Sequence, residues 1–195
     1  MESDRDFETE SQPWAPFFSH PKNSSRGFQS PLVTWFGLWG YTLLHENPTC
    51  LDEAIAQSNI FFDQSPRFLA RPETERWIHG ITRLAEAVES MDFSGILLVS
   101  ATVVNCVIRL SEKNQVPKWN QVVGNLQWDA PRYGRLKLRF GRNGTRHVAG
   151  VSHPSCGVAH ADVQASAKEM WPWIAKILEE HEMKNRTSRC TGPAC

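Results

Sequence analysis

An uninterrupted apolar run at residues 95–101 constrains the fold of this chain more than any other feature. A run without alternation is typical of a strand that is buried on both faces, as in a parallel sheet covered by helices. Residues 72–92 and 102–110, on either side, space their apolar residues as helices do. The order helix, central strand, helix predicts an α/β fold: a three-layer sandwich with a mostly parallel central sheet and helices on both faces.

Two further helices are expected around this unit. Residues 32–44 are aromatic and apolar without a period of two, which favours a buried helix. Residues 162–181 form the last predicted helix, in which Ser166 and Glu169 have capping-box spacing and Pro172 predicts a kink or the true start. In the 72–92 helix the predicted apolar stripe consists of Trp77, Ile78, Ile81, Leu84, Ala85, Val88 and Met91.

A β-hairpin is predicted late in the chain. Residues 135–140 alternate apolar and basic side chains, which indicates a half-buried strand. Asn143 and Gly144 form a turn signal, and residues 147–152 follow as a second strand. The hairpin is expected at one end of the sheet.

The length of 195 residues fits one domain with flexible ends. We predict a flexible N-terminal arm at residues 1–31, a single α/β domain at 32–183 and a flexible tail at 184–195. The first residues are acidic and polar, unlike a secretion signal, and no apolar stretch is long enough to span a bilayer. An intracellular protein, cytoplasmic or nuclear and without a membrane partner, is therefore expected.

The net charge is zero, with 21 basic and 21 acidic residues, so the chain has no global field to attract a polyanion. Nucleic-acid binding would need a local basic patch. Four cations of the predicted hairpin provide candidates for such a patch: Lys137, Arg139, Arg142 and Arg146.

The polar loop at residues 151–160 is the best candidate for chemistry, because sites form at the carboxyl ends of strands in α/β sheets. His153 can act as an acid, a base or a hydrogen-bond donor to an anion. Pro154 stiffens the loop, and Ser155 can bind phosphate through its hydroxyl group or adjacent N–H groups. The structural alternative is a loop that only turns the chain and caps the next helix.

Metal and nucleophile chemistry are further alternatives at the same loop. His153, Cys156 and His160, with His147 upstream, have side chains that ligate metals, but the second short ligand couple of a zinc signature is missing. Neither a metal nor a cofactor is therefore expected. Cys156 and Ser155 lack the Gly-x-Ser-x-Gly context of an activated nucleophile, and no glycine-rich phosphate loop occurs.

The order of these pieces resembles the later part of the uracil-DNA glycosylase superfamily, over about residues 51–180. Residues 58–62, the helix from Pro72, the strand 95–101 and the Ser-His-Pro-Ser loop at 152–155 stand in the family's order. The resemblance implies an α/β/α sandwich with a parallel sheet and DNA as the partner.

The resemblance also implies roles for individual residues. His153 would stabilise negative charge on a departing base, and Ser155, beside Pro154, would hold a phosphate. Asn59 would read a base edge, and Phe61 or Phe62 would stack on the base. The alternatives are a turn residue for Asn59 and core packing for the two phenylalanines.

The family's opening Gly-x-Asp-Pro-Tyr-like motif, which orients the attacking water, is absent before residue 59. The expectation is therefore a divergent glycosylase-like protein that binds nucleic acid, with weak or no base-excision activity. Two alternatives stay open: a small-molecule hydrolase that uses the 152–160 loop, and a non-catalytic α/β protein-interaction scaffold.

Overall fold

The computed structural model describes residues 29–41, 74–91, 93, 95–176 and 179, and these form an α/β fold with a five-stranded mixed sheet. The helices are α2 (Gln29–Leu38), α4 (Thr74–Ser90), α5 (Ala101–Glu112), α6 (Pro117–Val123), the 3-10 helix η2 (Pro154–Cys156), α7 (His160–Ala165) and a helical segment at 167–176. The strands are β1 (Gly95–Val99), β2 (Gln127–Asp129), β3 (Arg132–Tyr133), β4 (Leu136–Arg142) and β5 (His147–Val151).

The predicted tail at 184–195 and most of the predicted arm lie outside the described residues. Since α2 begins at Gln29, residues 29–31 belong to this helix and not to an arm. Within the described part of the chain, no helix is long and apolar enough to cross a membrane.

The sheet departs from the predicted topology. Its order is β1-β5-β4-β2, with β3 also paired to β4, and only the β1–β5 pair is parallel among the described strands. The prediction of a mostly parallel sheet is therefore wrong for these strands, and β1 takes an end position rather than a central one. The physical reason is the short connection from β4 to β5, which can join only antiparallel neighbours. The predicted hairpin forms, with Asn143 at a φ of 63° in the turn. It lies inside the described sheet, however, and not at one end of it.

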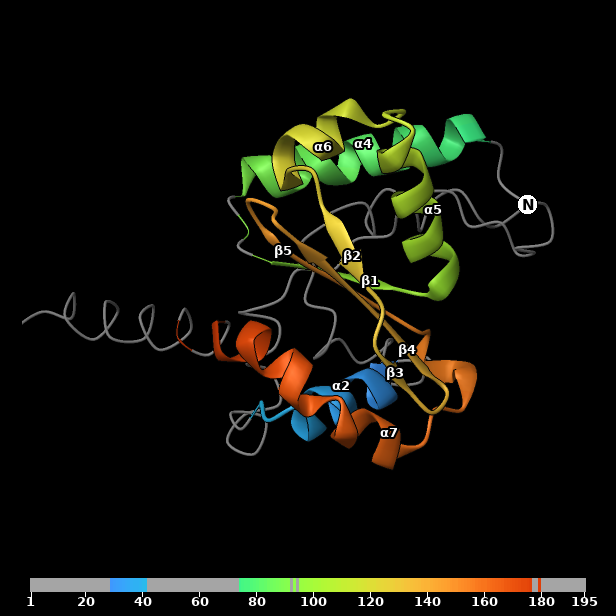
Figure 1. Ribbon diagram of the computed structural model, residues 1–195, viewed down its shortest axis with the longest axis vertical. Coiled ribbons are helices and arrows are strands. Elements are labelled where there is room, and N and C mark those ends of the chain that lie inside the picture. Colours follow the sequence, from blue (N-terminus) through green and yellow to red (C-terminus); the bar gives the residue numbers. More distant parts are fainter. Residues whose placement is uncertain (1–28, 42–73, 92, 94, 177–178, 180–195) are drawn as a thin grey trace, which may run out of the picture.

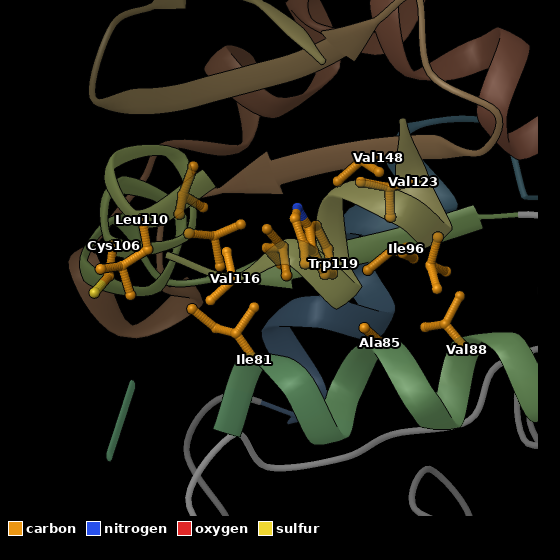
Figure 2. Packing of buried hydrophobic residues seen from close by; sticks show 14 of the residues in the cluster. Ile81, Ala85, Val88, Ile96, Cys106, Leu110, Val116, Trp119, Val123 and Val148 are labelled. Atoms are coloured by element: carbon orange, nitrogen blue, oxygen red, sulfur yellow. The ribbon is translucent and has the colours of Figure 1, made fainter. Parts of the chain in front are cut away.

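Both faces of β1 are nevertheless covered, as its apolar run predicted. Helices α4, α5 and α6 lie on one side of the sheet, and α2 and α7 lie on the other (Figure 1). Ile96 and Leu98 belong to the core cluster under the first group, whereas Leu97 and Val99 pack into the second cluster. In the first cluster Trp119 lies among the side chains of α4, α5 and the sheet (Figure 2).

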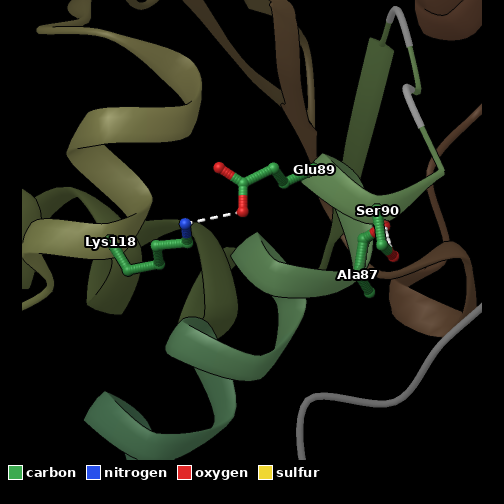
Figure 3. Close-up of polar contacts among 4 residues, drawn as sticks. All are labelled: Ala87, Glu89, Ser90 and Lys118. Carbon is green, nitrogen blue, oxygen red and sulfur yellow. Dashed lines mark hydrogen bonds and ion pairs between the residues drawn. The ribbon is translucent and has the colours of Figure 1, made fainter.

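The α4 helix shows the predicted amphipathic stripe. Trp77, Ile81, Ala85 and Val88 are buried against the first cluster. Met91, which was assigned to the stripe, follows the end of the helix and is 42% exposed. On the exposed side Glu89 forms an ion pair with Lys118 of α6 at 2.6 Å, while the Ser90 hydroxyl group donates to the Ala87 carbonyl within the last turn (Figure 3).

The last helix breaks at Ser166, not at Pro172. The Ser166 hydroxyl group donates to the Val163 carbonyl at 2.6 Å and accepts at 3.0 Å from Nε1 of Trp39, the residue after α2. The backbone N–H of Glu169 bonds the Ser166 carbonyl instead of the hydroxyl group, so the predicted capping box does not form. The hydroxyl group links the C-terminal ends of α2 and α7, because the buried indole N–H of Trp39 requires an acceptor.

Candidate functional site

The carboxyl ends of β1 and β5 meet at one edge of the sheet. Val99 pairs with Val151 in the parallel register, so Ser100 and Ser152 come next at the same edge. The backbone N–H of Ser100 donates to the Val151 carbonyl at 2.9 Å, and α5 begins directly after Ser100. The parallel pair thus brings the start of α5 beside the start of the polar loop. In Figure 1 α5 rises from this edge toward α6.

Ser152 anchors the loop to β4. Its side chain is buried, and its Oγ accepts from the backbone N–H of Lys137 at 2.9 Å. Its own N–H donates to the Lys137 carbonyl at 3.1 Å. These two bonds continue the β4–β5 ladder by one residue, and they fix the position from which His153 leaves the sheet.

His153 caps the 3-10 helix that the loop forms. Its Nδ1 accepts from the backbone N–H of Ser155 at 3.3 Å and lies 2.6 Å from Ser155 Oγ. Pro154 is buried and Ser155 is exposed. The loop therefore turns the chain, and His153 caps a 3-10 helix within it, whereas α7 begins after Ala159 without a side-chain cap.

The same contacts indicate which tautomer of neutral His153 is present. A backbone N–H can only donate, so Nδ1 is the acceptor and the neutral ring carries its proton on Nε2. Burial lowers the pKa of His153 below its ordinary value, which favours this neutral form. A neutral imidazole with Nε2–H is the form that donates a hydrogen bond to developing negative charge.

Three cations share one sheet face next to this loop. Arg132 of β3 lies directly opposite Lys137 of β4, and Arg139 projects to the same face two residues along β4. Like charges in directly opposite positions destabilise a sheet. Within the described part of the chain, none of the three side chains forms an ion pair. We call Arg132, Lys137 and Arg139 the basic strip.

The other two cations predicted for a basic patch lie elsewhere. Arg142 ends β4 at the far edge, where it forms an ion pair with Asp129. Arg146 precedes β5, and its guanidinium group donates to the Phe93 carbonyl. The alternation along β4 predicted the face of Lys137 and Arg139, but the contribution of Arg132 depends on β3, which was not predicted.

The predicted base-reading residues lie outside the described residues. These are Asn59, Phe61 and Phe62, so their roles at a base stay predictions. His153, Pro154 and Ser155 are consecutive residues of the polar loop, and their binding and catalytic roles stay predictions. Over the described ranges, no three or more His, Cys, Asp or Glu side chains are grouped as metal ligands would be.

Ser100 is a site residue that the sequence analysis missed. It has φ 106° and ψ 128°, a region that non-glycine residues rarely adopt and that costs on the order of 1–3 kcal/mol. Its hydroxyl group makes no capping bond to α5. The available signal was a serine placed directly between a buried strand and a helix.

Comparison with known protein families, curated proteins and solved structures finds no match to this chain.

Proposed function

We propose that this protein binds nucleic acid at the carboxyl edge of β1 and β5, in the manner of a divergent uracil-DNA glycosylase, with weak or no base excision. The basic strip carries the proposal. Three cations on one face, without carboxylates to pair them in the described residues, are unfavourable for the protein alone and favourable opposite a chain of phosphates. We also interpret the helices on the two sheet faces as the outer layers of a three-layer sandwich.

The polar loop supports the same assignment. The backbone N–H of Lys137 donates to Oγ of Ser152, and Ser152 directly precedes His153. The basic strip therefore lies next to the polar loop. Ser155 is exposed and can receive a phosphate, while His153 in its Nε2–H form can stabilise charge on a departing base. Binding is then the main activity, since the water-orienting motif of the family is absent.

The first experiment measures the affinity of the full chain for labelled single-stranded and duplex DNA as a function of salt. The slope of log K against log salt should fall by about 1 for Lys137→Ala and for Arg132→Ala, because each removes one phosphate contact. Lys168→Ala is the matched control, since Lys168 is exposed in the helical segment beyond α7. Absence of binding at low salt, or equal slopes for all variants, contradicts the proposal.

The second experiment measures base release from strands with uracil or damaged bases. If release is detected, His153→Ala should reduce it by about 10²–10³-fold while most of the DNA affinity remains. Ser155→Ala should instead weaken affinity in a salt-dependent way. Release that is unchanged in His153→Ala would exclude the assigned role of this histidine.

A hydrolase is the second candidate, and one distance favours it. Ser155 Oγ lies 2.6 Å from His153 Nδ1, within reach for a histidine base to activate a serine nucleophile. A serine-reactive phosphonate probe tests it: labelling of the wild type that is lost in Ser155→Ala supports the hydrolase, and an unlabelled wild type argues against it. The scaffold alternative has less support, because the exposed large apolar side chains in the described ranges, Met91 and Trp171, are isolated.

A further inference from the structure

A second site lies at the opposite end of α5 from the polar loop. A hollow of about 460 Å³ opens between the C-terminus of α5, α6 and β2. Its lining includes Ser111 and Glu112 from the end of α5 and, from the segment that follows, Asn114, Asn120, Asn125 and Trp128. Since α5 has 12 residues, its length separates this hollow from the loop by about 18 Å.

Asn120 fixes one part of the lining, which we call the floor and which consists of Ser111, Asn114 and Asn120. The Asn120 Oδ1 accepts from the Ser111 hydroxyl group, and its Nδ2 donates to the Ser111 carbonyl at 3.1 Å and to Asn114 Oδ1 at 3.3 Å. Both N–H groups of this amide are therefore used within the protein. Asn114, at φ 51°, lies just beyond the C-cap of α5, and its side chain belongs to this network. The floor is thus preorganised by contacts that need no ligand.

The other part of the lining, which we call the rim, consists of Glu112, Asn125 and Trp128. In the described part of the chain, the side chains of Glu112 and Asn125 and the indole N–H of Trp128 form no hydrogen bond or ion pair. Trp128 is half-buried, and the residue opposite it on β4 is Gly141, which places no side chain beside the ring. The rim therefore offers one aromatic face, one carboxylate and one amide around the same hollow.

We infer that this hollow binds a nucleobase that carries an exocyclic amino group, such as guanine. A flat base stacks on the indole ring of Trp128. The Glu112 carboxylate accepts from amino and imino N–H groups, whereas the Asn125 amide can both donate and accept. The hollow falls in the size range of small-molecule sites.

Charge defines what the hollow excludes. Among the described residues, its lining contains one carboxylate and no lysine or arginine, so a phosphate group is repelled. Uracil and thymine offer Glu112 a single N–H, at N3, which is flanked by two carbonyl oxygens that the carboxylate repels. Guanine offers adjacent imino and amino N–H groups, so uracil and thymine bind less tightly. The inference goes beyond the proposed function and does not rest on it. A nucleoside has no phosphate group, so its binding to the hollow needs no contact with the basic strip.

Calorimetric titration of the full chain with guanosine, cytidine, uridine and a methyl glucoside tests the inference. Guanosine should bind one to one and more tightly than uridine. Trp128→Ala should weaken guanosine at least about fivefold, through loss of base stacking, while Trp128→Phe retains most of the affinity. Trp171→Ala, at a 48% exposed tryptophan, is the matched control and should leave affinity unchanged.

Glu112→Gln and Asn125→Ala change exposed side chains, so they keep the test valid if Trp128→Ala does not fold. Glu112→Gln should remove the preference for guanosine over uridine, because an amide can also donate to carbonyl oxygens. Three outcomes overturn the inference: no guanosine binding by the wild type, binding that is unchanged in every rim variant, or equal affinity for the methyl glucoside.

Discussion

Gly150 of β5 is the position where one added methyl group tests how α5 is seated on the sheet. A Cβ built on Gly150 would lie 2.6 Å from Val104 Cγ2 and 2.8 Å from Cγ1. Val104 is 2% exposed, and its branched side chain has little rotamer freedom in a helix. The clash therefore cannot be relieved by rotation of a flexible chain, and α5 or β5 must shift.

The expected cost follows from two opposing terms. Overpacking of a buried site costs about 1–3 kcal/mol. Replacing glycine by alanine recovers about 0.4–1 kcal/mol through the entropy of the unfolded chain. We expect Gly150→Ala to lower the free energy of unfolding by about 1–2 kcal/mol. Val104→Ala alone should also destabilise, because it removes two buried methyl groups at about 0.8 kcal/mol each before any cavity term.

The double variant is the decisive measurement. The Val104→Ala substitution vacates the volume that the new Cβ needs, so Gly150→Ala should cost little in that background. Urea unfolding of the four proteins gives the coupling energy, which we expect to be about 1–2 kcal/mol. Additive losses in the double variant would refute the reasoning, because they would mean that Val104 and Gly150 do not contact each other.

Three further predictions concern single residues. Ser100→Gly should be more stable than Ser100→Ala by about 1 kcal/mol in urea unfolding, because only glycine adopts φ 106° without strain; equal stabilities would argue against that backbone conformation. Ser166→Ala should lower the free energy of unfolding by about 1–3 kcal/mol by leaving the buried Trp39 indole N–H without an acceptor, and the loss should shrink in a Trp39→Phe background. The pKa of His153 is lower in the folded state than in the unfolded state. Between these two pKa values the folded protein binds fewer protons than the unfolded chain, so the free energy of unfolding decreases as the pH falls through that window. Unfolding between about pH 5 and about pH 7.5 should therefore depend less on pH in His153→Gln than in the wild type, and an identical pH dependence would contradict the shift.

The elements that were predicted well are those whose apolar spacing fits either a helix or a strand, but not both. The stripe of α4 and the alternation of Leu136 and Leu138 on β4 were readable because helix and strand periods differ. The run at 95–101 correctly predicted a strand covered on both faces. Its end was misjudged, since Ser100 and Ala101 turn into α5. Elements α6, β2 and β3 are short and had no clear period, so they were not predicted.

The sequence by itself determined the local features of the candidate site. The spacing of His153 and Ser155 suffices for their mutual contact, because the two residues are neighbours in one 3-10 turn. Only the tertiary structure decided which residues join them. Strand order and register place Arg132 opposite Lys137 and Ser100 beside Ser152, and pairing between segments far apart in sequence leaves no trace in local periodicity. The same reason hid the hollow at Trp128, whose rim joins Glu112 at the end of α5, Asn125 after α6 and Trp128 of β2.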